Sequence, residues 1–105
     1  MEIIQIDENT RLRVEFDPDA ESPVMWDKSI TRDDEAYIRW VQGEVYGVIV
    51  ERRWKATRVQ VGNPDVAAVE EFVWEDDDSI WSCYLDDAYT AEVVAEEYFG
   101  IKKGQ

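Results

Sequence analysis

The stretch 43–54, GEVYGVIVERRW, constrains the fold of this chain more than any other. It contains Val45 and, at 48–50, the core of the longest aliphatic run in the sequence, between Gly43 and a charged segment. A short run rich in β-branched residues and bounded in this way is typical of a buried strand. We therefore expect a central strand here, and the aromatic and β-branched stretch 72–84, FVWEDDDSIWSCY, is its natural partner.

The flanking segments predict the other elements. Residues 3–16 alternate apolar and polar side chains around a polar turn, which predicts a β-hairpin. Helices are expected near 33–42 and over 87–99, where apolar residues recur at helical spacing and a glycine follows each pattern. The basic-to-polar stretch 55–61 keeps a strand-like alternation, so the central strand is either long or bent near Trp54.

The predicted architecture is a single α+β domain over 1–105, with an antiparallel sheet of four or five strands and both helices packed on one face. Strand segments are expected at 72–75 and 80–85, and the aspartates at 76–78 between them indicate a turn or a bulge, whereas 65–71 is open to helix or strand. Buried side chains are expected at Trp40, Val48, Val50, Trp81, Val94 and Tyr98, with Trp26 tucked against the core.

Charge limits the possible partners. The chain has 25 acids, 11 bases and no His, for a formal charge of −14, which disfavours direct binding to nucleic acid or anionic membranes. The segment 52–58 is a basic stretch, whereas no Lys or Arg occurs between 59 and 101. For the basic stretch, pairing with neighbouring acids is favoured over a separate anion site.

Motifs for catalysis or metal binding fail on inspection. Asp17, Asp19 and Glu21 have the spacing of a calcium loop, but Ser22 stands where Gly is needed and Lys28 where a bidentate Glu is needed. The two Pro-Asp pairs lack the acid and Lys that a metal-dependent nuclease would place on the next strand, so that alternative is disfavoured. With no His and no Gly-rich phosphate loop, we expect no enzyme, no metal and no cofactor.

Aromatic and sulfur side chains receive structural interpretations. The tryptophans could stack on bases, but such proteins also need a positive groove, and we expect Trp40, Trp54, Trp74 and Trp81 to pack in the core. The single Cys83 lies among apolar neighbours, which predicts an inert buried thiol.

No apolar run approaches the roughly 18 residues of a membrane helix, and the N-terminus is acidic where a signal peptide is basic, so a cytoplasmic location is expected.

Two phrases carry a resemblance to known proteins. YIRWVQGEVYGVIVE at 37–51 and, after an acid-rich segment, SIWSCYLDD at 79–87 resemble a family of short uncharacterised proteins of phages and mobile elements. The ESP and Trp-Asp phrases at 21–27 are similar to the family's N-terminal segment. The resemblance implies a mobile-element origin and an α+β fold. It transfers no catalytic residue, because the family's middle block with Cys and His is missing between Asp27 and Tyr37.

The acid density supports two hypotheses of different kinds. In the first, carboxylates at phosphate-like spacing occupy the basic nucleic-acid-binding surface of a host protein, as a DNA mimic blocking restriction or RNA-guided nucleases would. In the second, the acidity reflects solubility or adaptation to a saline cytoplasm. The predicted partner-binding residues are Asp76, Asp77, Asp78, Asp86, Asp87, Glu92, Glu96 and Glu97.

Overall fold

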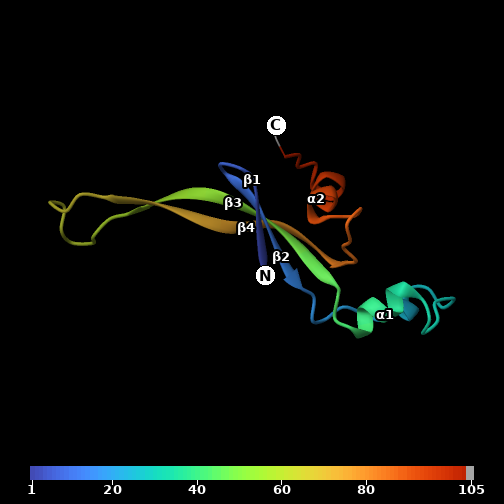
Figure 1. Cartoon of the computed structure of the whole chain (residues 1–105). Helices are drawn as coiled ribbons and strands as arrows, with labels where there is room; N and C mark the ends of the chain where they lie inside the picture. The colour runs from blue at the N-terminus through green and yellow to red at the C-terminus, as the bar shows by residue number, and fades with distance from the viewer. Residues whose placement is uncertain (104–105) are drawn as a thin grey trace.

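The computed structural model describes residues 1–103 and shows an α+β fold (Figure 1). Four strands form one antiparallel sheet in the order β1-β2-β3-β4, so the predicted α+β class and strand number are confirmed. The elements are β1 (Glu2–Asp7), β2 (Thr10–Phe16), the 3-10 helix η1 (Pro23–Met25), α1 (Glu35–Val41), β3 (Tyr46–Arg58), β4 (Val69–Cys83) and α2 (Ala91–Phe99).

β3 is the interior strand that the aliphatic run predicts. It pairs with β2 from Tyr46 to Arg52 and with β4 along its whole length. Val48 and Val50 are fully buried beneath α2, and Ile49 is buried on the opposite face of the sheet. Burial on both faces explains why this segment does not alternate between apolar and polar residues.

α2 covers one face of the sheet and completes the core. Its buried residues Val94 and Ala95 pack with Leu12, Val14 and Val48. The helix begins at Ala91, four residues later than expected from the sequence. The reason lies in the preceding turn, where the Asp86 carboxylate accepts hydrogen bonds from the amides of residues 88 and 89 and holds them outside the helix.

α1 does not lie on the sheet, so the prediction that both helices pack on one face is wrong for this helix. It has no buried residue and lies against η1 at one end of the molecule (Figure 1). Trp40 is half-buried, and its indole Nε1 donates to the carbonyl of Ala20 at 2.8 Å. The apolar side of this short helix therefore meets the loop after β2 instead of the sheet.

The aspartates at 76–78 form a bulge within one continuous strand. Val50 of β3 pairs with Asp78, and Glu51 pairs with Asp76, so Asp77 is an extra residue on β4. The bulge interpretation is thus correct and the turn interpretation is wrong. Four strands result instead of five.

A second irregularity in β4 explains why the predicted burial of Trp81 is wrong. Tyr46 pairs with Cys83 and Val48 with Ile80, so Trp81 and Ser82 together stand opposite Gly47. Ser82 has φ 61°, in the left-handed region, and the Trp81 ring lies where a side chain on Gly47 would project. Trp81 therefore packs on a backbone surface and stays 42% exposed.

Other aromatic side chains are also more exposed than expected. Tyr98 lies in the last turn of α2, Trp26 follows η1 at the surface, and Trp54 lies beyond the part of the sheet that has a third strand. All three are more than half exposed, and the predictions of burial are wrong for them.

The β3–β4 ladder continues past the body as a two-stranded arm. β2 pairing ends at Arg52, whereas β3 and β4 stay paired out to Arg58 and Val69. Residues 53–74 are called the arm here, and the remaining described residues the body. The arm and its end loop project far from the two helices (Figure 1), and the molecule measures 68 × 32 × 18 Å.

Candidate interaction surfaces

All eight acids of the predicted partner face are exposed, but they do not form one surface. Asp76 pairs across the strand with Glu51 and binds Arg13, which lies on the sheet face opposite α2. Asp78 pairs with Val50, which lies beneath α2. The bulge therefore divides its acids between the two faces of the sheet.

Two of the bulge acids are partly neutralised by arginines. Both oxygens of Asp76 accept from Arg13, at 2.8 and 3.2 Å, and this pairing holds the pKa of the Asp76 carboxyl below its usual range. Asp77 accepts from Arg52 at 3.2 Å. Asp76 and Asp77 are thus engaged within the fold and less available to a partner.

The acids around α2 are less neutralised. Among the described residues, Asp87 and Glu92 have no Lys or Arg within ion-pair distance, and Glu96 has only Lys102, at 3.9 Å. Asp86 accepts from two backbone amides, and these bonds lower the pKa of its carboxyl. This part of the predicted face presents fixed negative charge to solvent.

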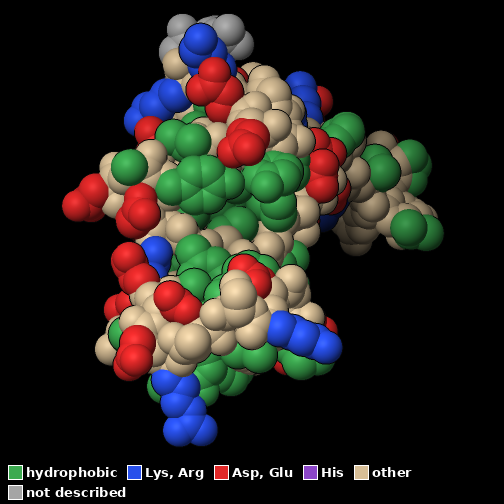
Figure 2. Space-filling model, turned by 90° about the vertical axis from the view of Figure 1, so that its right-hand side faces the viewer, with side chains coloured by type: hydrophobic (Ala, Val, Ile, Leu, Met, Phe, Trp, Pro, Cys, Tyr) green, Lys and Arg blue, Asp and Glu red, His purple; other side chains and the backbone are tan. Residues whose placement is uncertain are grey.

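Aromatic side chains lie among these acids. The Tyr89 hydroxyl donates to Glu97 at 3.3 Å, and burial together with the nearby Glu97 raises the pKa of Tyr89 to about 12. Tyr98 and Val93 are exposed on α2. Figure 2 shows hydrophobic side chains gathered in the upper part of this view, with acidic side chains around them. We call residues 86, 87, 89, 92, 93, 96, 97 and 98 the α2 face.

The basic stretch is paired with acids, as the favoured interpretation expects. Arg52 pairs with Asp77, and Arg53 with Glu8 of the β1–β2 turn. Lys55 pairs with Glu70 at 2.9 Å. Further out on the arm, Arg58 pairs with Glu71. These side chains do not form a free anion site.

The sheet face opposite α2 carries an ion network that the sequence did not reveal. The Glu51 side chain is 5% exposed and lies 3.1 Å from Arg11 and 3.3 Å from Arg13. The Arg11 guanidinium stacks over Trp74 at 4.2 Å from the ring centre. The polar alternation in β2 signals a charged face, but only the register identifies Glu51 as its partner.

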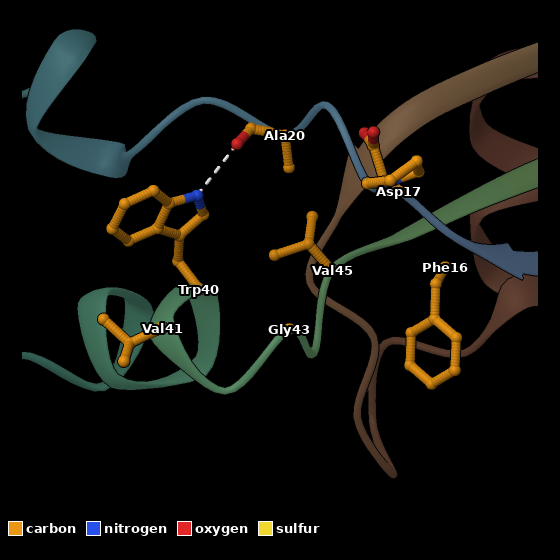
Figure 3. A pocket seen from close by; sticks show the side chains of 8 residues that line it. Phe16, Asp17, Ala20, Trp40, Val41, Gly43 and Val45 are labelled. Carbon is orange, nitrogen blue, oxygen red and sulfur yellow. Dashed lines mark hydrogen bonds between the residues drawn. The ribbon is translucent and has the colours of Figure 1, made fainter.

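A cavity of about 550 Å³ lies between the end of β2 and the end of α1 (Figure 3). Its walls are mainly apolar, from Phe16, Trp40 and Val45, and Asp17 is its acidic residue. Asp17 accepts from the amides of Asp19 and Ser82, at 3.1 and 2.9 Å. Since this carboxylate is engaged in holding the backbone, the cavity presents no nucleophile with an adjacent base.

The remaining candidates to consider are the Cys83 thiol, clusters of metal-binding side chains and membrane-spanning helices. Cys83 is buried, and burial raises the pKa of its thiol, as the inert-thiol interpretation expects. Across residues 1–103, no group of three acidic or cysteine side chains converges in a way that could hold a metal ion. None of the helices in the same range is long and apolar enough to span a membrane.

Comparisons of the chain with known protein families, curated proteins and solved structures find no match. The resemblance to short phage and mobile-element proteins therefore stays a prediction that rests on the phrases at 37–51 and 79–87.

Proposed function

We propose that this chain is a non-enzymatic binding protein whose acidic α2 face occupies a basic, nucleic-acid-binding surface of another protein. The observation that carries the proposal is the uneven neutralisation of charge. Bases lie beside acids in the arm and across the sheet, while Asp87 and Glu92 on the α2 face lack such partners among the described residues. Uncompensated carboxylates attract a positive surface from a distance.

The α2 face also has features that favour specific binding over nonspecific electrostatic attraction. Thr90 accepts from the amide of Val93 and fixes the first turn of α2, and the Asp86 turn fixes the approach to it. Tyr98 and Val93 are exposed on the same helix and supply apolar contact area beside the acids. Interfaces draw affinity from central aromatic contacts, while charges at the rim mainly set association rate and specificity.

The class of partner follows from this chemistry. A surface that accepts duplex or heteroduplex phosphates offers arginines and lysines at regular spacing, and rigid carboxylates can pair with them. The phage-like resemblance supports a host defence protein, such as a restriction or RNA-guided nuclease, met in the host cytoplasm. No cofactor, metal or direct contact with nucleic acid forms part of this proposal.

A displacement experiment tests the proposal. Nucleic-acid-binding proteins of the host are retained on DNA-cellulose at low salt, and the purified protein is then applied as a competitor. We expect selective elution of a specific host protein. Polyglutamate applied at equal total charge is the control, since it supplies negative charge without the arrangement. Equal elution by both competitors, or none by the protein, would contradict the proposal.

Charge reversal locates the surface. The double variant Asp87→Lys, Glu92→Lys should elute the partner at least about tenfold less effectively, because both side chains are exposed and lie on the α2 face. The matched control is Glu21→Lys, Asp33→Lys, which changes net charge equally on exposed positions of the loop and turn before α1. If both double variants lose activity equally, net charge alone determines binding.

A further inference from the structure

The arm carries no net formal charge, although the whole chain carries −14. Within 53–74, three bases balance three acids: Arg53, Lys55 and Arg58 against Asp65, Glu70 and Glu71. The entire formal charge therefore belongs to the remainder of the chain. Contact between two bodies would bring like charges together, whereas contact between two arms would not.

The outer edge of β4 in the arm is open. Among the described residues β4 is the last strand of the sheet, so the backbone groups on its far side have no strand partner there. Phe72 is 64% exposed, and Val69 is 50% exposed. A two-stranded ribbon is marginal in water, and an unpaired edge is a template for another strand.

We propose that two copies of this chain pair through the arm, with β4 antiparallel to β4 of the second copy and Phe72 opposite Phe72. The product is a four-stranded sheet, β3-β4-β4-β3, with a twofold axis through the Phe72 pair. This inference does not depend on the proposed function, because it uses the neutral arm and leaves the α2 face free.

The register follows from the positions of the acids. Side chains opposite each other in an antiparallel pair share a sheet face, so a twofold pairing must be centred on a residue. Centres at Glu70, Glu71 or Glu75 place an acid opposite itself, and a centre at Val73 places Glu71 opposite Glu75. Like charges directly opposite destabilise a sheet.

Phe72 is the centre that avoids these pairs. It places Glu70 opposite Trp74, Glu71 opposite Val73, and Glu75 opposite Val69. A centre at Trp74 would place Glu71 opposite Asp77 at the bulge, and a centre at Val69 would leave most of the strand unpaired. Every acid between 69 and 75 therefore meets an apolar residue only when the pairing is centred on Phe72.

The other free edge of the arm, on β3, is covered at its base. The Arg53 amide donates to the carbonyl of Asn9 at 3.0 Å, and the Arg53 side chain binds Glu8 and Asn9. The β1–β2 turn therefore lies across the base of this edge. A second arm running antiparallel along β3 would meet that turn, whereas no described strand flanks β4.

Pairing about Phe72 also keeps the two charged bodies apart. Glu75, where the body begins, aligns with Val69 of the second copy, so the two Glu75 positions are offset by six residues. At about 3.4 Å per residue this offset is about 20 Å. The screening length at physiological salt is about 8 Å, so most of the repulsion between the bodies is screened.

Sedimentation of the purified full chain over a wide concentration range tests the pairing. We expect a reversible monomer–dimer equilibrium. Phe72→Glu should weaken it at least about tenfold, because two acids then lie opposite each other. The matched control is Trp26→Glu, which adds the same charge at a site 60% exposed on the body. A wild-type chain that stays monomeric, or a dimer that Phe72→Glu leaves intact, overturns the proposal.

Cross-linking tests the register. Phe72→Cys should form an intermolecular disulfide under mild oxidation, because the two residues face each other. Glu70→Cys should not, because in this register position 70 of one copy lies about 14 Å from position 70 of the other, beyond disulfide reach. The buried Cys83 makes the wild-type chain the background control. Faster cross-linking through position 70 than through position 72 would overturn the register.

Discussion

The arm and the body are built from the same two strands but are stabilised differently. In the body, β3 and β4 lie beside β2 and under α2, and Val48 and Val50 are fully buried. In the arm no third strand pairs with the ladder within the described residues, and Trp54 and Phe72 are more than half exposed. The comparison shows that one continuous ladder can pass from a packed core to a ribbon held by cross-strand pairs.

Charge is distributed differently in the two regions as well. Each arm base is paired with an acid, two of them across the ladder, whereas several acids of the body have no described cation partner. The arm therefore lacks both a hydrophobic core and a net charge, and the body has both. This difference leads to separate expectations for how each region responds to substitution, pH and salt.

The largest expected difference concerns truncation of apolar side chains. Leu12→Ala removes a fully buried body residue and should lower the free energy of unfolding by about 2–5 kcal/mol. Phe72→Ala in the arm should cost less than about 1 kcal/mol when measured on the monomer at low protein concentration, because most of its ring is already in solvent. Urea denaturation followed by tryptophan fluorescence measures both. Equal losses would show that the arm shares the packing of the body.

The next expected effect concerns the contact between Gly47 and Trp81. Gly47→Ala should destabilise the protein by about 1–3 kcal/mol, since a β-carbon would collide with the Trp81 ring. In a Trp81→Ala background the same substitution should cost almost nothing. A double-mutant cycle from thermal unfolding measures this coupling. Additive effects would mean that the ring moves aside without cost.

The packed core and the contact between Trp81 and Gly47 show what could be predicted from the sequence and what could not. The central strand, the β1–β2 hairpin and α2 follow from local apolar patterns, and the structure confirms each of them. The position of Trp81 depends on its register against Gly47, which no local pattern specifies. The arm is equally non-local, because β3 leaves the three-stranded region where β2 ends.

The predicted acidic face illustrates the same limit. Exposure of all eight acids was predictable from composition and spacing. Asp76 binds Arg13, which is 63 positions away in sequence, and Asp77 binds Arg52, which is 25 positions away. Such contacts depend on strand order and on the bulge, so the sequence alone could not separate engaged acids from free ones.

A smaller effect is expected from acid. Pairing with Arg13 lowers the folded-state pKa of Asp76 below its usual value of about 3.9. Its stabilising contribution should therefore be fully present above about pH 4 and be lost as the pH falls through the folded-state pKa. Asp76→Asn should have a lower free energy of unfolding than wild type at neutral pH, and this difference should vanish in acid. Urea titrations at several pH values measure the difference. A difference that grows below pH 4 would contradict the assignment.

The smallest expected effect comes from the arm ion pairs, and salt should distinguish the two regions. Lys55 and Glu70 are both more than half exposed, so Lys55→Gln should cost only about 0.2–1 kcal/mol, and this loss should shrink as salt rises.

In the body, salt screens repulsion among acids and should raise the free energy of unfolding. Hydrogen exchange at several salt concentrations, and at a low protein concentration where the chain is monomeric, resolves both trends, because we expect arm amides to exchange by local opening and core amides of β3 by global unfolding. If the acids serve only tolerance of salt, the body should be poorly folded in dilute buffer. A body that is folded at low salt, and gains only modestly from added salt, instead fits carboxylates kept for a partner.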